Sequence, residues 1–172
     1  MIEVDVIVAD SRWSSAWPDP APLATQAVEA VLALVRPAGQ GNGLDIALSL
    51  DSDAGIRDLN RAWRGKDQPT NVLSFPAADH GPGGEARHLG DIVLAYETVV
   101  REAQSESKSP VHHAAHLVVH GTLHLLGYDH EGDAEGDAME ALEIQALARL
   151  GIADPYHDRV PGTVARGARP AS

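Results

Sequence analysis

Alternating apolar and polar residues predict four β-strands along the chain. Apolar side chains occupy every second position in the first eight residues and again from Leu44 to Leu50, which is the period-two pattern of a half-buried strand. Two shorter apolar runs follow, and the first of them is stopped by Pro76. The predicted strands are Met1–Val8, Leu44–Leu50, Asn71–Phe75 and Leu89–Ala95.

Apolar residues spaced three and four apart predict helices between and after these strands. Ser52 or Asp53 is expected to cap the second helix, and the acidic segment Glu131–Asp137 is expected to form a turn. The predicted helices are Leu23–Val35 after a proline-containing turn, a short helix ending near Trp63, Glu97–Ser105, Val111–Leu126 and about Asp137–Leu150. Because strands and helices interleave without a regular βαβ repeat, we expect an α+β fold with a small mixed sheet of about four strands.

Length and composition limit the kind of protein this is. A chain of 172 residues suggests a single domain, here expected over residues 1–156, with a flexible tail over 157–172 that has too few apolar residues to pack. The strand-like start is unlike a signal peptide, and no apolar run is long enough to cross a membrane, so we expect a cytoplasmic protein with no membrane partner. With no cysteine in the chain, any transition-metal site must use His, Asp or Glu.

Three histidines form the most informative motif. His120 and His124 are four residues apart on a predicted helix, so both imidazoles can reach one ion. Gly127 can adopt a positive φ and end the helix, and the following turn can return His130 towards the other two. A pair of histidines alone would be weak evidence for a metal site, and the third histidine after the glycine strengthens it. Three neutral imidazoles leave one tetrahedral position open. We therefore predict one zinc ion per chain in a catalytic type of site.

Other histidines occur earlier in the chain at the same four-residue spacing. His116 lies eight residues before His124, about 12 Å along a helix, so it cannot readily bind the same ion. It is expected to line the cleft or to hydrogen-bond near it, with a possible role as a proton shuttle. His112 and His113 are expected to be solvated.

The residue after the first ligand distinguishes this motif from that of zinc proteases. The spacing His-x3-His-x2-Gly-x2-His matches the ligand pattern of the metzincin proteases. Those enzymes carry a glutamate general base directly after the first histidine, whereas this chain has Gly121, which cannot take a proton. Proteolysis is therefore not expected, but the ion could still activate water or polarise a phosphoryl oxygen.

A basic segment supplies positive charge in a chain whose net charge is −12. The acidic balance argues against a general nucleic-acid binder but leaves room for a local basic patch. Arg57, Arg61, Arg64 and Lys66 fall within ten positions, and the arginines share one predicted helix face on which they could bind phosphate. Trp63 could stack on a base. The alternative is an ordinary solvated helix face with Trp63 in the core.

Several segments together resemble the YbeY family of bacterial endoribonucleases. They are Leu59–Pro76, which contains Pro-Thr-Asn-Val-Leu-Ser-Phe-Pro, then Leu89–Val93, Ala115–His130 and Met139–Glu143. The resemblance runs from about Leu44 to Tyr156 and departs from the family at Ala77–His88 and in the tail.

The resemblance carries expectations about fold, site and activity. It implies a small α+β metal-hydrolase domain with a metzincin-like zinc site on His120, His124 and His130, and it makes Arg64 the functional arginine. It further implies cleavage of single-stranded RNA in 3′-end maturation of the small-subunit (16S) rRNA and in ribosome quality control. The expected partners are single-stranded rRNA, the small ribosomal subunit and ribosomal proteins.

These expectations combine into a mechanistic hypothesis. Arg64 would stabilise charge on the phosphate oxygens, Arg57, Arg61 and Lys66 would help to bind substrate, and Asp129 would orient a ligand imidazole. Two alternatives remain open. The protein could be a ribosome-assembly factor with a mainly structural zinc, or a metal-dependent hydrolase of a small substrate.

Overall fold

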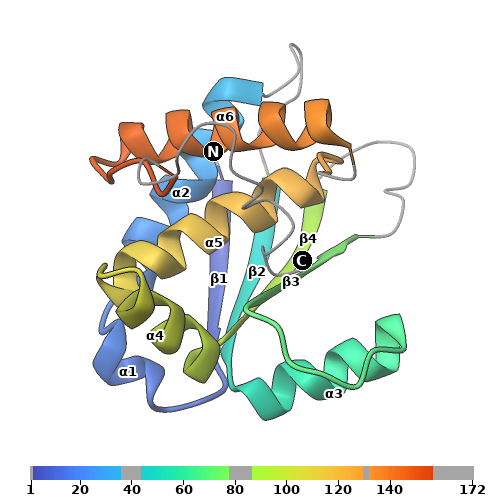
Figure 1. The fold of residues 1–172 in the computed structure, drawn as a ribbon. Coiled ribbons are helices and arrows are strands. Elements are labelled where there is room, and N and C mark those ends of the chain that lie inside the picture. The colour runs from blue at the N-terminus through green and yellow to red at the C-terminus, as the bar shows by residue number, and fades with distance from the viewer. Residues whose placement is uncertain (1, 36–43, 78–86, 130–131, 157–172) are drawn as a thin grey trace.

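A four-stranded mixed sheet forms the centre of the molecule (Figure 1). The computed structural model describes residues 2–35, 44–77, 87–129 and 132–156. In the sheet order β1-β2-β4-β3, strands β1 (Ile2–Val8), β2 (Leu44–Asp51) and β4 (Arg87–Ala95) are parallel. Strand β3 (Val72–Pro76) runs antiparallel to β4 and leaves its other side as a free edge of the sheet. The predicted α+β class and four-stranded mixed sheet are confirmed.

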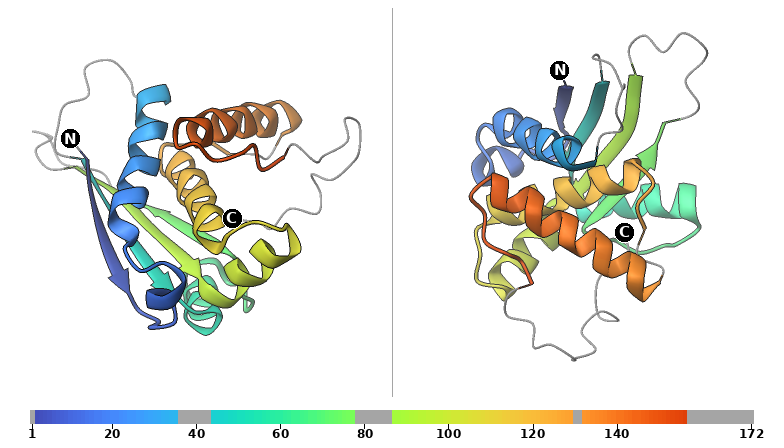
Figure 2. Two further views of the ribbon diagram at one scale, coloured as in Figure 1. Left: turned by 90° about the vertical axis from the view of Figure 1, so that its left-hand side faces the viewer. Right: turned by 90° about the horizontal axis from the view of Figure 1, so that it is seen from above.

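Helices cover both faces of this sheet. The larger layer is formed by α2 (Pro20–Val35), α5 (Pro110–Leu125) and α6 (Asp133–Arg149), which pack on one face (Figure 2). Helix α3 (Asp53–Arg64) packs on the opposite face of β3 and β4, where Ile56 contacts Leu73 and Val93 in a small second core. Two further helices, α1 (Trp13–Ala16) and α4 (Tyr96–Ser105), lie near the same end of the sheet (Figure 1).

The predicted elements match the observed ones except at three places. The four-residue helix α1 was not predicted. Helix α2 begins at Pro20, three residues before the predicted Leu23, because proline is tolerated in the first turn of a helix, where its missing N–H has no partner to lose. Helix α6 begins at Asp133, so the predicted turn over Glu131–Asp137 is wrong from Asp133 onward. Acidic residues in that first turn favour the helix N-terminus instead of breaking it.

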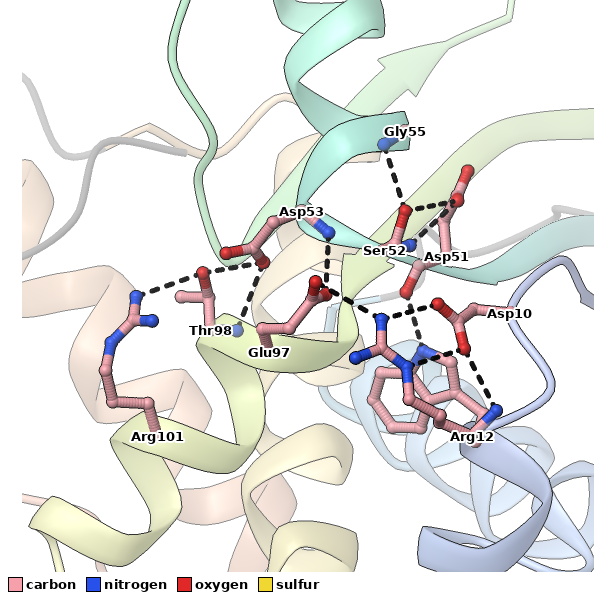
Figure 3. Close-up of polar contacts among 10 residues, drawn as sticks. Asp10, Arg12, Asp51, Ser52, Asp53, Gly55, Glu97, Thr98 and Arg101 are labelled. Atoms are coloured by element: carbon pink, nitrogen blue, oxygen red, sulfur yellow. Dashed lines mark hydrogen bonds and ion pairs between the residues drawn. The ribbon is translucent and has the colours of Figure 1, made fainter.

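The N-termini of α3 and α4 cap each other (Figure 3). The backbone N–H of Asp53 donates to Glu97 Oε1 at 2.9 Å, and the backbone N–H of Thr98 donates to Asp53 Oδ1 at 3.1 Å. Ser52 caps α3 as predicted, accepting from Gly55 N at 3.1 Å. Because each helix supplies a carboxylate to the other, the position of α3 is fixed relative to α4.

Some predictions fall on residues outside the described part of the chain. These are the flexible tail over 157–172, most of the Ala77–His88 loop and the third predicted metal ligand, His130. Among the residues that are described, no helix is long and apolar enough to cross a membrane.

Candidate metal and phosphate site

Helix α5 brings two of the predicted metal ligands together. It is buried on nearly all sides because it packs against the sheet and against α2, α4 and α6, and His120 is enclosed with it. One turn later His124 is partly exposed, and its Nε2 lies 3.1 Å from His120 Nε2. Gly127 has φ +96°, so the chain leaves the helix through the left-handed conformation that the sequence predicted.

A fully buried carboxylate from α6 holds His120 and, one turn before it, His116. Glu143 Oε2 lies 2.7 Å from His120 Nδ1, and Glu143 Oε1 lies 2.8 Å from His116 Nε2. The hydroxyl of Tyr156 also donates to Glu143 Oε1. Burial acts to raise the pKa of Glu143, but the hydrogen bonds from His116 and His120 outweigh burial and keep that pKa well below its usual value. Glu143 is therefore a carboxylate that accepts from both imidazoles.

This hydrogen bond fixes the tautomer of His120. Because Nδ1 donates to Glu143, the neutral ring leaves the lone pair of Nε2 for a ligand. Two nitrogens bound to one tetrahedral zinc at normal bond lengths lie about 3.3 Å apart, close to the 3.1 Å between the Nε2 atoms of His120 and His124. The two residues fit a zinc ion. Within the described ranges no set of three potential ligands converges, and His130 lies outside those ranges.

Glu143 was missed as a candidate site residue. The sequence predicted that Asp129 would orient a ligand imidazole, and this stays a prediction; the residue that contacts His120 is Glu143. A signal was present: Glu143 occupies a helical position in register with Met139 and Leu147, both of which are buried. A carboxylate in an apolar stripe requires a buried partner, and that partner is a histidine of the neighbouring helix.

The upstream histidines divide differently from the prediction. His116 hydrogen-bonds near the predicted metal ligands, as expected, through contacts with Glu143 and Tyr156, and its role as a proton shuttle stays a prediction. His112 is exposed, whereas the expectation that His113 is solvated is wrong. His113 is buried with its Nε2 2.8 Å from Glu102 Oε1.

Gly121 permits a close approach between α5 and the sheet. A Cβ atom at this position would lie 3.0 Å from Ser74 Oγ and 3.1 Å from two side-chain carbons of Ile92. The glutamate that zinc proteases carry here would therefore collide with β3 and β4 unless they moved. The close packing of α5 against the sheet at Gly121 thus leaves no space for the glutamate of the zinc proteases.

The free edge of β3 is where α3 and α5 meet. A cavity of about 350 Å³ lies there, and we call it the edge cavity. Arg64 and Trp63 enter it from α3 on one face of the sheet, and His124 enters it from α5 on the other. Its remaining lining is Ser74, Phe75 and Pro76 of β3. The structure thus brings Arg64 and a predicted zinc ligand, sixty residues apart in sequence, into one cavity.

Trp63 is part of this surface and not of the core. Its side chain is 73% exposed, with its ring centroid 6.2 Å from that of Phe75. Helix α3 ends directly afterwards at Gly65, whose φ of +70° is the left-handed conformation of a helix C-cap. The alternative in which Trp63 fills the core is therefore wrong.

The four predicted phosphate-binding residues fall into two groups, one with ion pairs and one without. Arg57 Nε lies 2.8 Å from Asp67 Oδ1 and Arg61 Nη1 lies 3.6 Å from the same atom. The hydrogen bonds from Arg57 lower the pKa of Asp67, so this carboxylate is ionised. Arg64 and Lys66 have no ion pair among the described residues, which leaves their charge available to a ligand.

Known proteins resemble this chain in sequence and in fold. The family model described as Endoribonuclease YbeY matches residues 19–151. A protein of Azorhizobium caulinodans named Endoribonuclease YbeY is 54% identical over 155 residues, covering 90% of this chain and 96% of its own. A second, from Bradyrhizobium sp., is 52% identical over 159 residues, covering 90% and 92%. The solution structure of a Thermotoga maritima protein, 23% identical, matches the fold with a TM-score of 0.51 over 95% of this chain and 99% of its own.

Proposed function

The chain belongs to the YbeY endoribonuclease family, and from that premise we propose that it is a zinc-dependent, single-strand-specific endoribonuclease. Its proposed role is 3′-end maturation of the 16S rRNA and ribosome quality control. One observation carries the proposal: Arg64 and His124 line the same edge cavity. A metal ligand beside an unpaired arginine is an arrangement suited to cleaving a phosphodiester.

The residues in and behind the edge cavity have different proposed parts. His120, His124 and His130 would hold zinc in a metzincin-like ligand set, and zinc when bound supplies a Lewis acid for the phosphoryl group and makes water more acidic. Arg64 stabilises negative charge on the phosphate oxygens, because its planar guanidinium can donate two parallel hydrogen bonds. Glu143 keeps the Nδ1 proton on His120.

Trp63 explains a preference for single strands. Its exposed ring offers a face on which one unstacked base can lie, and a base inside a duplex cannot reach it. The proposal also includes one domain over residues 1–156, a cytoplasmic location, and docking on the small ribosomal subunit through ribosomal proteins.

The substitution Arg64→Ala tests the division of roles. It is expected to keep one zinc per chain and to lower the rate of single-stranded RNA cleavage by about 10²–10³-fold, the usual loss when a preorganised charge donor is removed. Zinc content is measured by elemental analysis, and cleavage is followed on a labelled RNA oligonucleotide. Arg149→Ala, which removes an exposed arginine from the last turn of α6, is the matched control. Loss of zinc from the Arg64→Ala variant would refute the separation of metal and phosphate binding.

The net charge of −12 favours a second candidate, a ribosome-assembly factor with a mainly structural zinc. An acidic surface suits docking onto basic ribosomal proteins better than onto naked RNA. Full 16S rRNA maturation by a folded, zinc-free variant would support this function over catalysis. A hydrolase of a small substrate would leave Lys66 and the exposed ring of Trp63 without a role.

A further inference from the structure

A second cavity, of about 320 Å³, also has Arg64 in its lining. We call it the amide pocket and define it by Asn60, Arg64, Lys66, Asn71, Arg101 and Glu102, which come from α3, the segment after it and α4. Arg64 lines both cavities. A chain of phosphates that contacts Arg64 in the edge cavity can therefore continue directly into the amide pocket.

Two amide side chains in this pocket have unused acceptors. Asn60 and Asn71 are only 3% and 5% exposed. The Nδ2 of Asn60 donates to the carbonyl of Gln68 at 2.8 Å, and the Nδ2 of Asn71 donates to Glu102 Oε1 at 3.1 Å. Because both partners can only accept, the orientation of each amide is fixed. Both Oδ1 atoms are then buried acceptors with no hydrogen-bond partner in the described structure.

Glu102 adds a partly exposed carboxylate to the same wall, and its Oε1 already accepts from Asn71 and His113. Burial raises the pKa of Glu102, but hydrogen bonds with His113 and Asn71 more than offset this and lower the pKa below its usual value. The carboxylate is held by His113 Nε2 at 2.8 Å. Buried acceptors without donors are uncommon in folded proteins, so the amide oxygens of Asn60 and Asn71 match a ligand that carries hydroxyl or amino donors.

The cations of the pocket are unpaired. Arg64, Lys66 and Arg101 form no ion pair with any other described residue, in contrast to Arg57 and Arg61 beside them. Arg101 Nη2 donates instead to Thr98 Oγ1 at 3.2 Å, and Thr98 is held by Asp53 (Figure 3). Three cations against one carboxylate make the pocket suited to an anion.

We propose that the amide pocket binds the ribonucleotide next to the cleaved bond. Its phosphate lies against Lys66, Arg64 and Arg101, and its free ribose hydroxyl, the 2′-OH, donates to one of the amide oxygens of Asn60 and Asn71. Hydroxyls beside a phosphate are present in every ribonucleotide, so the pocket selects RNA over DNA without reading the base. This inference rests on the proposed function, in which Arg64 contacts the neighbouring phosphate.

Binding of a labelled oligonucleotide tests the pocket. The full zinc-loaded chain is titrated into an eight-nucleotide single-stranded RNA of mixed sequence, and into the same sequence as DNA, with fluorescence anisotropy as the readout. Short readings at 4 °C and a gel of each sample verify that the RNA is intact. Lys66→Ala and Arg101→Ala are each expected to weaken RNA binding about 3–10-fold and to reduce its salt dependence by about 0.7 in logarithmic slope. The control Arg149→Ala is expected to leave both unchanged.

Each comparison in this experiment tests a different contact of the amide pocket. Binding of both pocket variants at the level of the control would overturn the pocket. DNA bound as tightly as RNA by the unaltered chain would overturn the ribose contacts. Arg101→Lys keeps the charge and should restore most of the binding that Arg101→Ala loses, and a failure to do so would remove the phosphate contact from Arg101.

The failure of this inference is distinguishable from failure of the proposed function. RNA that is cleaved by the unaltered chain, but bound equally by all pocket variants, leaves the nuclease activity standing and removes the pocket. RNA that is bound through Lys66 and Arg101 but never cleaved would instead remove the activity and keep the pocket. In steady-state cleavage the pocket variants should raise KM with little change in kcat, because they remove binding away from the reacting phosphate.

Discussion

The two helices that meet at the free edge of β3 hold their functional side chains in opposite ways. On α5, His120 is enclosed and its Nδ1 is held by Glu143 at 2.7 Å. On α3, Arg64 is exposed and has no ion pair with any described residue. One side of the cavity is thus preorganised by buried hydrogen bonds, and the other offers a charge that is not neutralised.

This difference follows from what each group would bind. Metal ligands must be deprotonated at the coordinating nitrogen and aimed at one point, which requires a fixed tautomer and a rigid helix. A phosphate-binding arginine must instead remain uncompensated until the anion arrives, because an internal carboxylate would compete with the ligand. Arg57 and Arg61 both pair with the carboxylate of Asp67, whereas Arg64 has no ion pair with any described residue.

The largest effect is expected from removing a predicted zinc ligand on α5. His124→Ala should remove both zinc and RNA cleavage, because two remaining imidazoles bind the ion too weakly to retain it. Elemental analysis and the RNA cleavage assay measure the two losses. His112→Ala, on an exposed position of the same helix, should change neither. One zinc per chain in the His124→Ala variant would exclude His124 from the ligands.

A smaller effect is expected from the carboxylate behind the ligand. In the Glu143→Gln variant one side-chain oxygen becomes an N–H₂ group, which cannot accept from an imidazole. One of His116 and His120 then loses its acceptor. Zinc affinity should fall about 10–100-fold, as is usual when an outer partner of a ligand histidine is lost. A competition titration with a chelator measures it, with Glu135→Gln on the exposed first turn of α6 as control. Equal zinc affinity in both variants would contradict the role of Glu143.

The close packing of α5 against the sheet predicts that a larger residue in place of Gly121 lowers the free energy of unfolding. In Gly121→Ala the new methyl group meets Ser74 Oγ at 3.0 Å and Ile92 carbons at 3.1 Å. Overpacking costs about 1–3 kcal/mol, whereas the higher helix propensity of alanine returns about 1 kcal/mol. Urea unfolding should therefore show a net loss of about 1 kcal/mol, with Gly132→Ala, where a Cβ meets nothing within 4 Å, as comparison. A more stable Gly121→Ala variant would show that β3 and β4 give way.

The smallest effect is expected on the exposed side, at the arginine that is already paired. Arg57→Ala should change RNA cleavage by less than about threefold, because the guanidinium of Arg57 is occupied by Asp67 and lines neither cavity. The cleavage assay used for Arg64→Ala measures it. A loss as large as that of Arg64→Ala would restore the sequence-based expectation that Arg57 binds substrate.

Much of the fold was predictable because it depends on local patterns. All four strands were found from alternating or continuous apolar residues, and of the two predicted caps of α3, Ser52 or Asp53, the structure shows Ser52. The errors fall where one residue type has two local meanings. Proline before α2 and aspartate before α6 were interpreted as turn signals, but both are also favoured in the first turn of a helix.

The site was predictable only where its residues share a helix. The spacing of His120 and His124 predicts convergence, and the structure shows their Nε2 atoms 3.1 Å apart. Burial of His113 was not predictable, since its carboxylate partner, Glu102, belongs to the preceding helix. Helix spacing alone could not distinguish Arg64 from Arg61, which are three residues apart; only the family resemblance singled out Arg64, and the structure shows that Arg61 pairs with Asp58 and Asp67.

The sequence by itself determined the α+β class, the paired histidines, the glycine in place of a protease base, and membership in a family. These features depend on residue identity and on spacing within one element, where the helix repeat fixes the geometry. Only the tertiary structure decided that Glu143 holds His120, that Trp63 is exposed, and that Arg64 shares a cavity with His124. Each of these depends on elements far apart in the chain, and their approach is fixed by the packing of α3 and α5 on opposite faces of one sheet.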